Sequence, residues 1–458
     1  MKGYDNMINN SILCNKILSA LEENNIQNFS LTNVVTSTDE LFFEKKNLVL
    51  SRNSETEKCE ITIYNDFEAD GKKMRGSSSF IADSTMSLDD ISKKISSAFT
   101  TALSVHNPYY KLPASNSMFT TDDNETLISS ANTANYSAYD LEEMIYKYDT
   151  NSEAFINSCE IFVTTKDYHI INSNGINVSY SDTTYFSEYI VQCKEPNDVE
   201  IYQDMKFSSL DSNIEHSIKE MITNSLNMVK DRANAIPINS ITNAPAYENI
   251  ILEGNCVYEL FNYYVKRLDA SMIYPGYSSF KIGEKVFATS KVRNLDEQNI
   301  INSIINDSDI EDSINIILNP KKPYSNEGIK LISATLVKDN IAKCITGNSR
   351  FSHYLGIPAI GEYSSYKLKC GNTTFDEMCK KPHLRIVNFS DFQMDNFTGQ
   401  FGGEYRLAYY FDGKTTTPVT NGSISGNIND LVKSMYLSKE SQSFYDYEGP
   451  LRVCYNNN

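Results

Sequence analysis

The chain has 458 residues, of which 40% are hydrophobic and 22% are charged, so its composition is that of a folded protein and not of a disordered one. This length predicts two or three domains, because one hydrophobic core rarely serves more than about 300 residues. The formal net charge of −18 argues against nucleic acid or an anionic membrane surface as the main partner, since both bind basic surfaces.

The cysteines and the apolar runs indicate in which cellular compartment the protein is expected. Nine cysteines are present, an odd number, and no C-x-x-C spacing occurs, so neither a disulfide framework nor a zinc ribbon is indicated. We expect reduced, mostly buried thiols in a cytoplasmic protein. The N-terminal stretch "NSILCNKILSAL" lacks a basic region and a cleavage site, and no run of 18 apolar residues exists, so we expect neither a signal peptide nor a membrane span.

Residues 1–117 are predicted to form an α+β domain. A helix is expected at about 7–24, followed by strands that are joined by turns, with a hairpin connection at Asp70-Gly71. A second helix is predicted in "SLDDISKKISSAFTTALSV", where Ser87 is the expected N-cap and the apolar residues follow helical spacing. The prolines of "NPYYKLP" end this helix and begin a connector.

Residues 118–245 are predicted to form a middle region that contains an antiparallel meander. Ser137 is the expected cap of a helix in "AYDLEEMIYKY". The apolar and β-branched runs that follow are divided at Asn174-Gly175, a strong signal for a two-residue hairpin turn. A long helix, "NIEHSIKEMITNSLNMVKDRANA", is expected to end before Pro237.

Residues 246–458 mix strands with short helices. "EYRLAYYFDGKTTTPV" predicts a hairpin with Asp412-Gly413 at its turn, "GNINDLVKSMYLS" has helical periodicity, and "GPLRVCYNNN" is predicted to be a terminal strand. Because strand runs cluster apart from helices along the chain, the predicted class is α+β, with an N-terminal mixed domain of antiparallel strands and a strand-rich C-terminal domain.

Residues that commonly carry catalysis are sparse in this sequence. Five histidines are present and none lies in an H-E-x-x-H or H-x-H pattern, although a metal site built from distant residues stays open. Cys256 and Cys344 are candidate nucleophiles without a supporting local motif. Arg350 and His353 either contact an anionic group or begin a solvated helix.

The glycines of "FTGQFGGEYRLAYYFDGK" suggest a contact with another backbone. Glycine in or beside a strand marks a bulge or a close approach of a second chain segment, which a peptide bound as an additional strand would require. A tight turn without a ligand is the other interpretation. The candidate peptide-binding residues are Thr398, Gly399, Gln400, Phe401, Gly402 and Gly403.

The C-terminal half resembles the TldD/PmbA family. The segments "SSFKIGEKVF", "NEGIK", "ITGNSRFSHYLGIPAIGE", "FDEMCK", "FTGQFGGEYRLAYYFDGKTTTPVTNGSISGNINDLVKSMYLS" and "GPLRVCY" follow the order and spacing of that family over about residues 246–456. The resemblance implies an α+β dimer whose active members are metallopeptidases that shorten, clear or mature peptides. It also implies that an extended peptide binds as a strand in a groove between subunits.

The resemblance implies a metal-binding helix that this chain has lost. The TldD type carries H-E-x-x-x-H on a helix of the C-terminal domain, together with a late cysteine ligand. The stretch "ILEGNCVYELFNYYVKRLDAS" lies at that place, but Glu253, Gly254 and Tyr258 are not a His-Glu-His set and Glu259 has no neighbouring histidine. Cys454 falls beyond the expected ligand loop. We therefore expect no catalytic residue and no metal ligand in this chain, as in the PmbA (TldE-like) branch.

Three functions follow from these observations. The first is a non-catalytic subunit that forms the peptide groove, paired as a heterodimer with a TldD-like subunit that holds zinc, or as a homodimer. The second is an independent peptidase that uses Cys256 or a dispersed metal site. The third is a peptide-binding regulatory protein, in keeping with the "modulator of DNA gyrase" name used in this family. In each case the expected ligand is an extended peptide.

Overall fold

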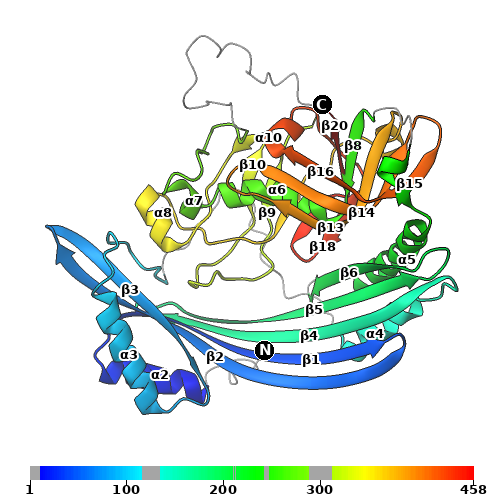
Figure 1. Ribbon diagram of the computed structural model, residues 1–458. Helices are drawn as coiled ribbons and strands as arrows, with labels where there is room; N and C mark the ends of the chain where they lie inside the picture. The colour runs from blue at the N-terminus through cyan, green and yellow to red at the C-terminus, as the bar shows by residue number, and fades with distance from the viewer. Residues whose placement is uncertain are drawn as a thin grey trace, which may run out of the picture.

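The structure is a computed structural model that describes residues 11–115, 135–209, 211, 213–241, 247–287 and 312–457. Long antiparallel strands make up the N-terminal part, and the C-terminal part combines two further sheets with short helices (Figure 1). The predicted α+β class is confirmed.

One six-stranded antiparallel sheet makes up most of the N-terminal part, in the order β3-β2-β1-β4-β5-β6. Its strands come from both the first and the middle predicted regions: β1 Asn28–Glu44, β2 Asn47–Ala69, β3 Lys72–Asp83, β4 Ala154–Asn172, β5 Asn177–Cys193 and β6 Val199–Ser208. The sheet is strongly curved, and the C-terminal domain lies above its concave side (Figure 1).

Four helices belong to this sheet: α2 Ile12–Glu23, α3 Leu88–Ala102, α4 Ala138–Lys147 and α5 Ile214–Ala233. They pack on the face that carries Leu31, Leu41, Ile161 and Tyr189, in two separate apolar clusters. Because side chains alternate along a strand, the opposite face carries a mixture of polar and aromatic residues and is turned toward the C-terminal domain.

The caps and turns expected from the sequence are confirmed in this part. Ser87 and Ser137 accept hydrogen bonds from backbone amides three residues later, at the starts of α3 and α4. Asp70 and Gly71 both have positive φ, as the tightest hairpin turns require. Gly175, with φ 89°, lies between β4 and β5 as expected, but the connection runs from residue 173 to residue 176 and is longer than the predicted two-residue turn.

The C-terminal domain contains two sheets. A six-stranded sheet has the order β11-β10-β9-β12-β19-β18, and an eight-stranded sheet has the order β17-β20-β8-β13-β14-β15-β7, with β16 also paired to β14. Their bounds are β7 Ile236–Pro237, β8 Asn249–Glu253, β9 Ile316–Leu318, β10 Ala334–Lys338, β11 Ile341–Ala342, β12 Tyr366–Leu368, β13 His383–Met394, β14 Gln400–Phe411, β15 Thr416–Thr420, β16 Gly422–Asn427, β17 Tyr436–Leu437, β18 Ser441–Phe444, β19 Tyr447–Pro450 and β20 Arg452–Asn456.

Short helices complete this domain: η1 Ile238–Ser240, α6 Asn255–Arg267, α7 Ala270–Ile273, α8 Ser349–Leu355, α9 Phe375–Met378 and α10 Ile428–Leu431. The helix predicted in "GNINDLVKSMYLS" is therefore confined to α10, because Tyr436 and Leu437 pair with β20 instead of continuing the helix. Within the part of the chain that the structure describes, none of the helices combines the length and the apolar character that crossing a bilayer requires.

Candidate functional site

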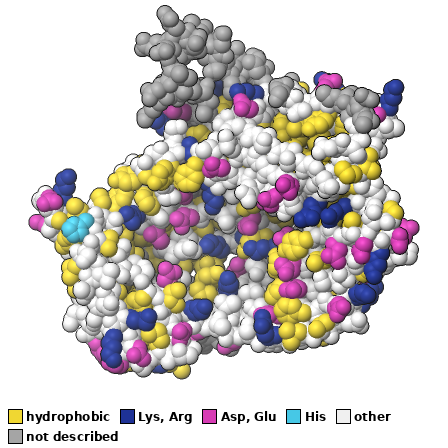
Figure 2. All heavy atoms as spheres, viewed as in Figure 1, with side chains coloured by type: hydrophobic (Ala, Val, Ile, Leu, Met, Phe, Trp, Pro, Cys, Tyr) yellow, Lys and Arg dark blue, Asp and Glu magenta, His cyan; other side chains and the backbone are white. Residues whose placement is uncertain are grey.

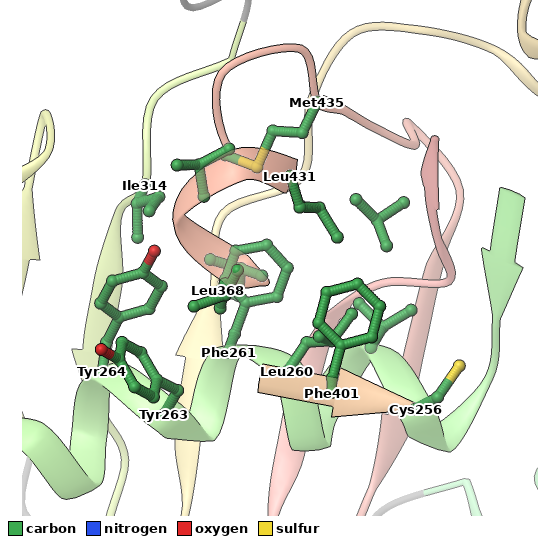
Figure 3. Close-up of a cluster of buried hydrophobic side chains, with 14 of the residues drawn as sticks. Cys256, Leu260, Phe261, Tyr263, Tyr264, Ile314, Leu368, Phe401, Leu431 and Met435 are labelled. Atoms are coloured by element: carbon green, nitrogen blue, oxygen red, sulfur yellow. The ribbon is translucent and has the colours of Figure 1, made fainter. Parts of the chain in front are cut away.

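Helix α6 occupies the position at which the resemblance places a metal-binding helix. It follows β8 directly, through Gly254, whose φ of 90° is a conformation that glycine adopts at little cost. Most of its side chains are buried, and Leu260, Phe261 and Tyr264 have no exposed surface. Figure 3 shows these side chains packed against residues of other elements, among them Ile314, Leu368, Phe401, Leu431 and Met435.

The polar residues of α6 do not fit a zinc ion. Zinc in proteins takes cysteine, histidine and carboxylate ligands, usually three or four converging on one point. On α6 these groups are Cys256 and Glu259 alone. Cys256 is buried and its Sγ contacts the carbonyl of Glu253, and burial raises the pKa of its thiol well above the ordinary value. Two such groups on one helix are fewer than the three or four ligands that a zinc site in a protein usually has.

Glu259 is the acidic residue of α6 and is partly buried. Burial raises the pKa of its carboxyl group from 4.5 to about 7, and Asn255 Nδ2 donates a hydrogen bond to its Oε1 at 3.1 Å. A carboxyl group with a pKa near neutrality is suited to proton transfer, but a general base also needs a substrate or a metal-bound water beside it. Among the described residues, Glu259 is not part of any group of three His, Cys, Asp or Glu side chains that could hold a metal ion.

The histidines lie apart from one another. His169 is buried in β4 and contacts Asn177 Oδ1 through Nε2 at 2.8 Å. His383 begins β13, where its Nδ1 donates to the carbonyl of Lys381 at 2.9 Å and burial lowers its pKa. Over the described ranges, no three His, Cys, Asp or Glu side chains converge so as to hold a metal ion.

The remaining candidates from the sequence have structural roles. Burial raises the pKa of Cys344 to about 12, so its reactive thiolate form is strongly disfavoured at neutral pH. Arg350, in α8, donates through Nη2 to Asn107 Oδ1 at 2.6 Å and lies over the ring of Tyr354. It therefore joins the C-terminal domain to the connector that follows α3.

A charged cluster that the sequence did not reveal closes the end of β8. Glu253 Oε2 accepts hydrogen bonds from Arg385 at 3.0 Å and from Arg452 at 2.6 Å, and the Phe375 ring lies against both guanidinium groups. The three charged residues belong to β8, β13 and β20, and each side chain is about one-fifth exposed or less. This cluster fixes three neighbouring strands of the eight-stranded sheet immediately before α6.

The candidate peptide-binding residues lie at the start of β14. Gln400 to Gly403 line a surface pocket of about 720 Å³, which we call the hairpin pocket. Thr398 and Gly399 form the turn before it, where Thr398 donates to Asp395 Oδ2 at 2.6 Å. The other residues that line the hairpin pocket are Ser390, Asp391, Gln393, Met394, Asp395, Glu404 and Ser423.

The glycines of this segment are close to the chain's own strands. Strand β14 pairs with β13 on one side over Phe401 to Glu404 and with β16 on the other side over Gln400 to Glu404. A Cβ at Gly403 would lie 2.2 Å from the carbonyl oxygen of Asp391, and one at Gly402 would lie 2.9 Å from that of Ile424. Both glycines are therefore required by the packing of this sheet, independently of any ligand.

The side chains of the segment point in two directions. Phe401 is 4% exposed and packs beside α6 in the core (Figure 3). Gln400 is exposed at the rim of the hairpin pocket. The outer side of β16 carries no strand within the described residues, so β16 is the open sheet edge nearest to this pocket. Whether a peptide binds here stays a prediction.

The comparison with solved structures defines the class of fold. A protein from Thermotoga maritima assigned as a modulator of a DNA gyrase matches with 13% identity and a TM-score of 0.69, over 96% of this chain and 97% of that one. TldE from Thermococcus kodakarensis matches with 12% identity and a TM-score of 0.70, over 97% and 99%. A protein from Bacteroides thetaiotaomicron, also assigned as a modulator of DNA gyrase, matches with 13% identity and a TM-score of 0.71, over 97% of each chain. The fold of this chain is therefore the one shared by these three structures.

Family comparison agrees with the fold. Residues 246–454 match the model of the PmbA/TldA metallopeptidase C-terminal domain. These residues therefore form a C-terminal domain of the TldD/PmbA family, and this domain contains α6 and the hairpin pocket. No curated protein matches the chain.

Proposed function

We propose that this chain is a non-catalytic subunit of a TldD/PmbA-type metallopeptidase complex, in which it forms part of the groove that holds the peptide. The observation that carries the proposal is the use of α6 as a core helix, at the position where the active members of the family bind their metal. A TldD-like partner chain would supply the zinc and the metal-bound water that attacks the peptide bond.

The packing of α6 supports a role without catalysis. A catalytic helix must turn its ligands toward a cavity that substrate can enter, whereas α6 turns Leu260, Phe261 and Tyr264 into a filled core. Glu259 has the proton affinity of a general base but no imidazole neighbour that would fix a metal. Regaining a zinc site would require at least two new ligands, and it would disturb the core around α6.

The hairpin pocket supports a role in holding a peptide. Peptides that bind as an added strand pair with an open sheet edge and place alternate side chains in pockets beside it. In this chain the open edge is β16, and Ser423 of β16 also lines the pocket that contains Gln400 and Glu404. We therefore assign the main-chain contacts to β16 and the side-chain contacts to the face of β14.

A variant that fills the hairpin pocket tests this proposal. Ser423 is exposed on β16, and Ser423→Trp would place an indole ring in the path of the peptide. Ser51→Trp is the matched control, because Ser51 is also an exposed serine in a strand and lies in the distant N-terminal sheet. Both variants are purified with a TldD-like catalytic chain, and cleavage of an unfolded peptide is followed.

We expect Ser423→Trp to raise KM for the peptide at least tenfold, while Ser51→Trp leaves it unchanged. Equal kinetics for the two variants would contradict the assignment of the pocket. Peptide binding without cleavage, with the catalytic chain present and loaded with zinc, would contradict the subunit role and favour a regulatory protein.

A further inference from the structure

A second cavity lies between the N-terminal sheet and the C-terminal domain, and we call it the interdomain cavity. Its volume is about 340 Å³, at the lower end of the range of about 300–1,000 Å³ that is usual for small-molecule sites. Strands β4, β5 and β6 supply one wall. The loops around Lys322, Glu362 and Asp446 supply the other. Figure 2 shows basic and acidic side chains intermixed around the hollow between the two domains.

The lysines of this cavity are largely left without acidic partners. Lys166, Lys206 and Lys322 all line it, and no carboxylate of the described residues lies within ion-pair distance of any of them. Lys206 instead lies over the ring of Tyr445, 3.9 Å from the centroid, and Lys322 Nζ donates to Asn326 Oδ1 at 3.0 Å. Three cations therefore face one cavity with their charge uncompensated by direct contact.

The carboxylates Asp182, Glu362 and Asp446 of the cavity also have neutral hydrogen-bond partners and no ion pair with its lysines. Asp182, directly opposite Lys166 across β4 and β5, accepts a hydrogen bond from the Tyr445 hydroxyl at 3.3 Å. Glu362 accepts one from Asn348 Nδ2 at 3.3 Å, and Asp446 has a hydrogen bond with the side chain of Ser364. Each carboxylate has a neutral partner, and each keeps an electrostatic interaction with lysines across the cavity.

The walls are held together by direct contacts, so the cavity is preformed. The Tyr445 amide donates to the carbonyl of Lys206 at 3.2 Å, which ties the turn between β18 and β19 to β6. Lys321, the fourth lysine of the lining, forms an ion pair with Asp211 at 2.9 Å. A preformed cavity with fixed charges lowers the entropic cost of binding a ligand.

We propose that the interdomain cavity binds a small zwitterion, an amino acid or a dipeptide with both ends free. Such a ligand offers a carboxylate to the lysines and an ammonium group to the carboxylates, within a volume that suits its size. A divalent cation would be repelled by the three lysines, and a multivalent anion by the three carboxylates, so neither satisfies both sets of charges.

The ionisation of the lining agrees with this assignment. Burial raises the pKa values of Asp182, Glu362 and Asp446 and lowers that of Lys322. These directions mean that each charged form has lost hydration and regained too little from its neighbours. A ligand with both charges would restore the missing interactions on both walls.

Calorimetric titration of the isolated chain with alanyl-alanine tests the proposal. We expect saturable binding of this dipeptide and at least tenfold weaker binding of N-acetyl-alanyl-alanine, which lacks the ammonium group, and of alanyl-alanine amide, which lacks the carboxylate. The doubly capped dipeptide and inorganic phosphate are expected not to bind. The absence of saturable dipeptide binding would overturn the proposal. So would equal affinity for the capped peptides, or phosphate binding as tight as that of the dipeptide.

Variants on opposite walls locate the ligand. Lys166→Met and Asp446→Asn each remove one charge at nearly constant size, and we expect each to weaken dipeptide binding at least tenfold, with Lys166→Arg restoring it. Lys93→Met, at an exposed lysine of α3 paired with Asp89, is the control and should bind as the unmodified chain does. Unchanged binding in both cavity variants, with folding checked by circular dichroism, would place the ligand elsewhere.

This site is independent of the hairpin pocket. The Ser423→Trp variant should keep its affinity for alanyl-alanine even though peptide turnover in the complex is impaired. Loss of dipeptide binding in Ser423→Trp would mean that the dipeptide occupies the hairpin pocket, and the interdomain assignment would then be wrong.

Discussion

Helix α6 and the hairpin formed by β13 and β14 belong to the same domain but use their side chains in opposite ways. The helix is packed on nearly every side, and its aromatic residues form the centre of the C-terminal core. The end of the hairpin beyond Asp391 is largely exposed and borders a pocket of about 720 Å³. Phe401 is a point of contact between them, because it is the second residue of β14 and packs beside α6 (Figure 3).

The difference separates residues that hold the domain together from residues that can contact a second molecule. Residues whose substitution would unfold the domain are concentrated on α6, so little freedom remains there for metal ligands. The exposed polar residues at the end of the hairpin, such as Gln400, contribute little to the core, so they are free to contact a second molecule. Variants in the two regions should therefore have opposite effects on stability and on peptide handling.

The largest effect on stability is expected from Phe261→Ala in α6. Phe261 has no exposed surface, and truncating a buried phenylalanine costs about 3–5 kcal/mol, since transfer free energy is lost and a cavity remains. Lys266→Ala, at an exposed position of the same helix, should change the free energy of unfolding by less than about 0.5 kcal/mol. Urea unfolding of both variants measures this difference, and equal costs would contradict the core role of α6.

A smaller loss is expected from Glu253→Gln. Removing this charge leaves the mostly buried Arg385 without its carboxylate partner and leaves Arg452 with only the longer contact to Glu440 at 3.7 Å, which costs about 2–4 kcal/mol at sites of this burial. Glu248→Gln is the control, because the ion pair of Glu248 with Lys381 is exposed and such pairs contribute about 0–1 kcal/mol. Thermal unfolding of the two variants at pH 7 makes the comparison. A Glu253→Gln variant as stable as the control would mean that the cluster does not hold the strands.

The raised pKa of Glu259 predicts that the free energy of unfolding depends on pH. Its pKa is about 7 in the folded chain and near 4.5 when unfolded, so the folded state binds the proton more tightly. Its contribution to stability is therefore present below pH 4.5 and is lost as the pH rises through 7. After allowance for partial exposure, Glu259→Gln should be about 1–2 kcal/mol more stable than the unmodified chain at pH 8 and nearly equal at pH 4.5. Denaturant unfolding at the two pH values checks this, and a pH-independent difference would contradict it.

The smallest effect on stability is expected at the hairpin. Gln400 is exposed and its side chain lines the pocket, so Gln400→Ala should change the free energy of unfolding by less than about 0.5 kcal/mol. The same variant should weaken peptide binding in the assembled complex, measured by fluorescence anisotropy of a labelled peptide. A marked loss of stability would remove the contrast between the hairpin and α6.

Local features of the fold could be read from the sequence. Ser87 and Ser137 as caps, and Asp70-Gly71, Asn174-Gly175 and Asp412-Gly413 as turns, depend on neighbouring residues alone and are seen in the structure. The extent of α10 could not be predicted, because helical periodicity after Leu431 is overridden by the pairing of β17 with β20. Pairing between strands that are far apart in the sequence determines where such a helix ends, and the periodicity of the local sequence does not show this pairing.

The candidate site was predictable in part. The glycines between Thr398 and Gly403 marked this segment as a candidate site in the sequence. These glycines are needed because β13 and β16 lie close to β14, and this closeness follows from the strand register, which the sequence does not show. The interdomain cavity and the Glu253 cluster combine residues from distant strands and have no local motif. Lys166 and Asp446, for example, are 280 positions apart (446 − 166 = 280) and still line one cavity.

Metal analysis of the isolated chain, together with a peptidase assay, tests the central claim most directly. The account predicts less than about 0.1 zinc per chain after purification in zinc-containing buffer, because α6 lacks a tight zinc ligand set, and no cleavage of an unfolded peptide until a TldD-like chain is added. One zinc per chain, with cleavage by this chain alone that a chelator abolishes, would contradict it.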